Sequence, residues 1–244
     1  MKPFLILQLR PESDAAEEEF EALLDKGGLP RARAHRIRLD QEPLPQGLSA
    51  RDFAGVIVGG GPGCVSDPPE KKTPAEAQCE AAVMRLMPEI VGEDVPFLGC
   101  CYGIGILGHF LGAPVSKARW SEPVGTSACR LTEEGRRDPL LEGCPDEFVA
   151  FVGHKEALQA LPEGAAHLVA SETCPFQMIR AGRNVYATQF HPEADGAVFE
   201  TRIRTYRNHG YFPPEDADRL IEMCHAAPVE APPLILRNFV RRYG

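Results

Sequence analysis

The sequence predicts an α/β fold, in which an open, mostly parallel sheet forms the middle of three layers and carries helices on both faces. Short apolar runs alternate with longer amphipathic segments through the first 111 residues, as strands alternate with helices in such folds. The connections are short, and the apolar runs are continuous, as in strands buried on both faces. Several β-rich runs separated by turn residues follow, which adds a smaller antiparallel element.

The expected strands are short apolar or alternating runs bounded by Gly, Pro or charged residues. They cover residues 3–9, 33–39, 53–58, 95–98, 124–131, 147–153, 167–171, 176–179 and 185–189. The expected helices follow capping residues, prolines or glycines and cover residues 13–27, 74–91, 102–111, 198–208, 213–224 and 232–242. The first of these helices should be capped by Ser13 or Asp14.

No repeat, low-complexity tract or flexible linker interrupts the chain, so we expect one domain over residues 1–244. A helical insertion should occupy about residues 202–233, before the closing helix. Its arginines and aromatic residues fit a partner surface or a lid, but an ordinary added helical hairpin is the simpler interpretation.

Composition excludes several classes of protein. The net charge is −9 and no long Lys/Arg-rich run occurs, which argues against nucleic-acid binding. The eight cysteines form neither a CxxC metal site nor a compact disulfide framework, which favours a reducing compartment. No signal peptide and no apolar run of the ~20 residues that span a membrane is present. We therefore expect a soluble, cytoplasmic protein with no metal and no membrane partner.

A cysteine stands at the sharpest predicted corner of the chain. The apolar run of residues 95–98 stops at Gly99, and a second apolar stretch opens at Tyr102. Gly99 and Gly103 flank Cys101 at a distance of two residues, where glycines let a strand and a helix approach closely. The helix that follows would favour a thiolate through its dipole. We interpret Cys101 as a nucleophile and Cys100 as a core residue.

Two further segments fit such a nucleophile. The glycine run that begins at Gly59 follows a strand and is not a dinucleotide fingerprint, but it could direct backbone N–H groups at an oxyanion. His191 ends a predicted strand and is followed by Pro192 and Glu193. A histidine oriented by a carboxylate can accept a proton from a thiol.

Together these segments resemble class I glutamine amidotransferases, a flavodoxin-like α/β family. The motifs are G-x-C-x-G at residues 99–103, G-G-P-G at residues 60–63 and Q-F-H-P-E at residues 189–193. The stretches at residues 151–156 and 170–176 resemble the amidotransferase domain of GMP synthase and its free-standing relatives in particular.

The resemblance implies a Cys101-His191-Glu193 triad that hydrolyses the γ-amide of glutamine through a γ-glutamyl thioester. It implies oxyanion donors at the N–H groups of Tyr102 and of Gly60 or Gly61. No cofactor is implied. His154 would line the substrate pocket by analogy, although a polar loop residue would look the same.

One departure concerns the substrate. The family usually has Gln where this chain has Gly105, and that Gln helps to hold the substrate. Losing its amide could cost about 1–3 kcal/mol where a partner group is left unpaired. Free glutamine would then bind weakly, or the pocket would accept a larger molecule.

Three functions stay open at this point. The chain could release ammonia from glutamine for a separate synthetase subunit, because no ATP-pyrophosphatase loop or P-loop occurs in it. It could instead be a γ-glutamyl hydrolase or peptidase that acts on a small γ-glutamyl molecule without an ammonia-using partner. A regulatory or binding protein with weak catalysis is the alternative of another class. Whether the chain forms a homodimer is also open.

Overall fold

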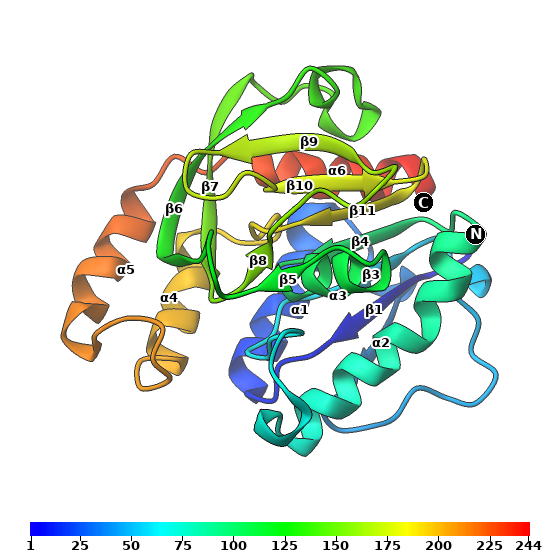
Figure 1. Cartoon of the computed structure of the whole chain (residues 1–244), viewed down its shortest axis with the longest axis horizontal. Coiled ribbons are helices and arrows are strands. Elements are labelled where there is room, and N and C mark those ends of the chain that lie inside the picture. The colour runs from blue at the N-terminus through cyan, green and yellow to red at the C-terminus, as the bar shows by residue number, and fades with distance from the viewer.

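The computed structural model describes all residues 1–244 and confirms the α/β fold class (Figure 1). Nine strands form one mixed sheet in the order β2-β1-β3-β4-β11-β10-β9-β6-β7. The strands of this sheet are β1 (Phe4–Gln8), β2 (Ala34–Arg38), β3 (Val56–Val58), β4 (Phe97–Cys100), β6 (Glu122–Leu131), β7 (Glu147–His154), β9 (Ala166–Ser171), β10 (Met178–Ala181) and β11 (Val185–Thr188). Pairing is parallel from β2 to β11 and antiparallel beyond.

The predicted antiparallel element is continuous with the parallel part of the sheet. The hairpin of β10 and β11 makes the junction, because β11 pairs parallel with β4 and antiparallel with β10. A separate two-stranded antiparallel sheet consists of β5 (Val115–Ser116) and β8 (Ala157–Leu158).

Six α-helices accompany the sheet. They are α1 (Ser13–Gly27), α2 (Pro74–Gly92), α3 (Tyr102–Phe110), α4 (Gly196–Thr205), α5 (Ala217–Ala226) and α6 (Ala231–Tyr243). Helices α1 and α6 pack against each other on one face, and α2 and α3 lie together on the other (Figure 1). None of these helices is long and apolar enough to cross a membrane.

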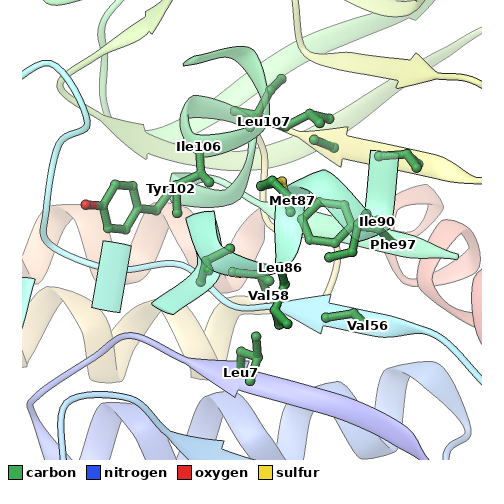
Figure 2. Packing of buried hydrophobic residues seen from close by; sticks show 14 of the residues in the cluster. Leu7, Val56, Val58, Leu86, Met87, Ile90, Phe97, Tyr102, Ile106 and Leu107 are labelled. Atoms are coloured by element: carbon green, nitrogen blue, oxygen red, sulfur yellow. The ribbon is translucent and has the colours of Figure 1, made fainter. Parts of the chain in front are cut away.

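Two apolar cores hold the layers together, one on each face of the sheet. Alternate residues of β1 divide between them: Leu5 and Leu7 face the core under α2 and α3, whereas Phe4 and Ile6 face α1 and α6. Figure 2 shows the first of these cores, where Leu86, Met87 and Ile90 of α2 meet the sheet. A smaller third core joins α4 and α5 to β7.

The structure corrects three details. Helix α1 begins after Glu12 without a side-chain cap, so Ser13 and Asp14 do not cap it. Strand β3 begins at Val56 rather than at Phe53, because the chain bends at Phe53 and Ala54. Helix α5 starts at Ala217, after another such turn, rather than at residue 213.

Candidate active site

The predicted functional segments meet at one edge of the sheet. Strands β3, β4 and β11 are neighbours and run parallel. Their carboxyl ends therefore bring together the glycine run at 59–61, Cys101 and the segment 189–193. This edge is where open α/β sheets bind ligands.

The Cys101 corner is strained in the way that its glycine spacing indicates. Cys101 has φ 53° and ψ −89°, outside the regions that non-glycine residues usually adopt. Its N–H donates to the carbonyl of Thr188 at 2.8 Å, which ties the corner to β11. A Cβ at Gly99 would lie 2.9 Å from the carbonyl carbon of Gly103, so only glycine allows this approach of strand and helix.

The two adjacent cysteines have different surroundings. Cys100 is fully buried in the core against α1 and α6. Cys101 lines two cavities at the sheet edge. The geometry therefore separates a core cysteine from one that a substrate could reach.

His191 is held on three sides. Its Nδ1 lies 2.9 Å from Oε1 of Glu193, and its backbone N–H donates to the carbonyl of Phe151. Phe199 of α4 packs edge-on against the imidazole, with 5.7 Å between ring centroids. Because Nδ1 faces the carboxylate, Nε2 is left for proton exchange.

Arg202 adds a cation to this pair. Its Nη2 donates to the same Oε1 of Glu193 at 2.6 Å. Burial by itself would raise the pKa of Glu193, but His191 and Arg202 lower it below its usual range. Glu193 is therefore a carboxylate that accepts from both neighbours.

Burial disfavours the charged form of both reacting groups. It raises the pKa of the Cys101 thiol to about 12, although Arg10 and Arg202 act in the opposite direction. Burial also lowers the pKa of His191 to about 4, and Arg202 acts in the same direction. Burial thus opposes the effect that the helix dipole would have on the thiol. No hydrogen bond joins Cys101 to His191, but both line one cavity.

The predicted oxyanion donors do not share one environment. The N–H of Gly60 donates to Oε1 of Glu19 at 3.2 Å, so it is not free, and this part of the prediction is corrected. The N–H of Gly61 has no partner, and that of Tyr102 opens α3, where the first N–H groups have none within the helix. Gly61, Tyr102 and Cys101 line the same cavity.

That cavity, which we call the donor cavity, contains both predicted substrate-binding positions. A Cβ at Gly105 would lie 3.0 Å from Oε1 of Glu156, so this carboxylate occupies the space next to the glycine. His154 lines the donor cavity, but its Nδ1 contacts the carbonyl of Glu156 and its Nε2 contacts Glu122. With both ring nitrogens engaged, His154 acts as a buried structural residue at the end of β7.

Four side chains of the site were not found from the sequence. Glu156 faces the donor cavity and accepts from the N–H groups of Val65 and Ser66 at 2.7 and 2.9 Å. Tyr211 lines both cavities, and Arg10 and Arg202 line the second. The sequence drew attention only to the arginines and aromatic residues from Arg202 onward, and nothing in it placed them near Cys101.

One group of three side chains comes close enough to share a metal ion. Ligand atoms of Glu122, His154 and Cys174 lie within 4.8 Å of one another. The hydrogen bonds of His154 already use both of its nitrogens, so this group is explained by hydrogen bonding.

Comparison with known proteins assigns the family. The family model for glutamine amidotransferase class-I matches residues 21–211. The chain belongs to the class I glutamine amidotransferase family. This confirms the resemblance drawn from the motifs, and with it the expectation of an amidotransferase-type enzyme.

The curated relatives of this amidotransferase chain include GMP synthases described as glutamine-hydrolyzing. That of Thermosipho melanesiensis is 34% identical over 150 residues, which cover 61% of this chain and 26% of the relative. That of Streptococcus thermophilus is 33% identical over 175 residues, covering 70% and 29%. The chain thus spans about a quarter of the length of these relatives.

Solved structures support the amidotransferase fold. A glutamine amidotransferase from Thermotoga maritima superposes with a TM-score of 0.76 at 20% identity, covering 100% of this chain and 98% of the other. One from Methylobacillus flagellatus gives 0.69 at 22% identity, with coverage of 100% and 94%. At these identities the likeness concerns the fold.

Proposed function

We propose that this chain hydrolyses the γ-amide of L-glutamine with Cys101 as nucleophile, His191 as general base and acid, and Glu193 as the group that orients His191. The observation that carries the proposal is the strained corner at Cys101. It holds the thiol in one cavity with a histidine whose other nitrogen is fixed by a buried carboxylate. Strain of this kind costs about 1–3 kcal/mol and persists where function requires the geometry.

Acylation would proceed in a balanced sequence. The Cys101 thiol gives its proton to Nε2 of His191 while sulfur bonds to the γ-carbon of glutamine. The N–H groups of Gly61 and Tyr102 donate to the oxyanion. The C–N bond then breaks, His191 returns the proton to the leaving nitrogen, and ammonia departs.

Deacylation regenerates the thiol. Water attacks the thioester carbon and gives a proton to His191, which passes it to the departing sulfur as glutamate leaves. The high pKa of the thiol and the low pKa of the imidazole oppose the ion pair in the empty site. Glu193 offsets part of this cost, because it stabilises the imidazolium.

We further propose that the ammonia passes to a synthetase. The GMP synthases that the chain resembles are described as glutamine-hydrolyzing, and the chain spans about a quarter of each. The active site of a synthetase would be the acceptor.

A second candidate function is hydrolysis of a γ-glutamyl compound larger than glutamine. The absence of the family's usual Gln side chain at Gly105 favours it, because a group that would hold glutamine is missing there. The second cavity also favours it, since it lies beside His191, where a leaving group larger than ammonia would extend.

The first test is hydrolysis of L-glutamine and of a γ-glutamyl dipeptide by the wild-type chain, Cys101→Ala and Cys100→Ala. We expect turnover in the wild type, its loss in Cys101→Ala, and its retention in Cys100→Ala, whose sulfur lies in the core. Turnover that survives in Cys101→Ala would reject the proposed nucleophile. Turnover of the dipeptide alone would select the second candidate.

A further inference from the structure

Two cavities meet at Cys101, and only one of them contains His191. The donor cavity is lined by Gly105, Glu156 and Gln189. The second, which we call the arginine cavity, is lined by His191, Arg10, Arg202 and Tyr206. Its volume is about 40 Å³, which leaves room for a few water molecules.

The chemistry assigns opposite ends of the substrate to these cavities. The group that protonates the leaving nitrogen must lie next to that nitrogen. His191 is that group in the proposed reaction, so the leaving amine extends into the arginine cavity. The γ-glutamyl part then occupies the donor cavity on the other side of Cys101.

Arg202 has unused hydrogen-bonding capacity in the arginine cavity. It is only 6% exposed, and only its Nη2 makes a bond, to Glu193. Its Nε and Nη1 are buried without a partner. Buried N–H groups are nearly always satisfied, and those of a charged guanidinium are costly to leave unpaired. Because Arg202 lines the cavity, an acceptor bound there would lower this cost.

Arg10 adds to the same cavity. Its Nε donates to Glu19 at 2.9 Å and its Nη1 to the hydroxyl of Tyr206 at 3.1 Å, while its Nη2 makes no hydrogen bond. Glu19 and Glu193 balance the charges of the two arginines. An incoming anion would thus be recognised by the three free donor nitrogens rather than by excess positive charge.

We propose that the arginine cavity binds a leaving amine that carries a carboxylate, so that γ-glutamyl amino acids or short γ-glutamyl peptides are the substrates this site prefers. A planar guanidinium fork matches a carboxylate in geometry. This inference rests on the proposed cysteine hydrolase. The covalent steps are those given above, with the amino group of the released amino acid taking the proton in place of ammonia.

The test compares γ-L-glutamyl-L-alanine with its C-terminal amide and with L-glutamine. The amide keeps the shape of the leaving group and removes only its charge. The dipeptide with a free carboxylate (the acid) can form charge-assisted hydrogen bonds that its amide cannot. We therefore expect kcat/KM for the acid to exceed that for the amide by about 10–100-fold. The same preference should appear in calorimetric affinities for Cys101→Ala, where no turnover is needed.

Arg202→Gln identifies the source of the preference. Arg202 also positions Glu193, so every substrate will react more slowly, but the acid-to-amide ratio cancels this effect and should fall toward one. Arg204→Gln is the matched control, because Arg204 lies on the same helix, is exposed and pairs with Glu200. Its ratio should equal that of the wild type. Should Arg202→Gln fail to fold, Arg202→Lys, which keeps the charge without the fork, should lower the ratio partly.

The outcomes separate this inference from the proposed function. Equal rates for acid and amide, with glutamine turned over, would overturn the inference and leave the hydrolase proposal standing. A ratio unchanged in Arg202→Gln would also overturn it, since groups other than Arg202 would then recognise the carboxylate. A third outcome combines two results: Cys101→Ala binds the acid more tightly than the amide, and the wild type turns over no substrate. This outcome would support the cavity assignment and reject the proposed hydrolase.

Discussion

The chemistry of His191 depends on groups outside its own His-Pro-Glu motif. Burial and the positive charge of Arg202 keep its imidazole neutral, with a pKa of about 4. Phe199 and Arg202 both come from α4, which follows the His-Pro-Glu segment. The local motif supplies the base and its carboxylate, and α4 sets the base's protonation state.

This shift predicts how stability depends on pH. The folded pKa of His191 is lowered from 6.5 to about 4, so between these values the unfolded state binds a proton that the folded state does not. Stability must therefore rise with pH across this window. Between pH 7.5 and 5 the free energy of unfolding should fall by on the order of 2 kcal/mol from this group alone. Urea unfolding at a series of pH values measures it.

Two variants check the assignment to His191. His191→Gln should flatten the pH dependence over this range, whatever its stability at pH 7.5. His35→Gln, which replaces an exposed histidine of β2, should leave it intact. An equally steep dependence in His191→Gln would show that another group is responsible. The lowered pKa of Glu193 acts in the same direction only at lower pH.

At the residue scale, motifs were predictable and long-range partners were not. Cys101, His191 and Glu193 stand in short patterns whose spacing reflects local geometry. Arg10 reaches Tyr206 across 196 positions, and no local pattern records that contact. The hydrogen bond between the N–H of Gly60 and Glu19 could not be predicted for the same reason, since these residues are far apart in the sequence. That bond engages one of the predicted oxyanion donors.

The corner between β4 and α3 is the element on which the site depends. A Cβ at Gly99 would lie 2.9 and 3.0 Å from backbone atoms of Gly103, and backbone cannot move aside as a flexible side chain can. Gly99→Ala should therefore shift the helix, lower the free energy of unfolding by about 1–3 kcal/mol and abolish most turnover. Urea unfolding and glutamine hydrolysis measure the two effects.

Gly103→Ala is the matched control for this element. A Cβ there meets Val58 at 3.8 Å, an ordinary contact, and the residue lies in a helix, where alanine is favoured. We expect near-normal stability and turnover. Similar losses in both variants would mean that the corner does not depend on the close approach at Gly99.

The predicted helices and strands were correct where apolar periodicity was strong. Details were missed where contacts with distant residues set the end of an element. The strands at the parallel edge and the hairpin of β10 and β11 follow from short apolar runs and a turn. The start of α1 was misjudged, because Ser13 makes a good cap in principle but lies inside the helix. Strand β3 starts only at Val56, because the chain bends at Phe53 and Ala54. The turn before that bend is held by a bond from the Ala50 N–H to Glu89 of α2, a contact that no local pattern indicates.

At the scale of the whole molecule, the segment predicted as an insertion lies beside the site. The connection between α4 and α5 brings Tyr211 to both cavities (its helices are labelled in Figure 1). The hydroxyl of Tyr211 donates to the carbonyl of Pro62 at 3.3 Å, and Nζ of Lys155 lies 3.9 Å from its ring centroid. Among the three predicted roles, these contacts favour a lid.

Access to Cys101 should then depend on Tyr211. The donor cavity has a volume of about 20 Å³, enough for about one water molecule and far too small for glutamine. Movement of the connection would widen the cavity, and the contacts of Tyr211 with Pro62, Lys155 and Tyr206 oppose that movement. Tyr211→Ala should speed the alkylation of Cys101 by iodoacetamide several-fold, which mass spectrometry of the labelled peptide measures over time. Tyr243→Ala removes a tyrosine that lines neither cavity, and it should leave this rate unchanged. Equal alkylation rates in the wild type and in Tyr211→Ala would place the entrance elsewhere. Faster alkylation together with weaker substrate binding in Tyr211→Ala would show that Tyr211 also holds the bound substrate.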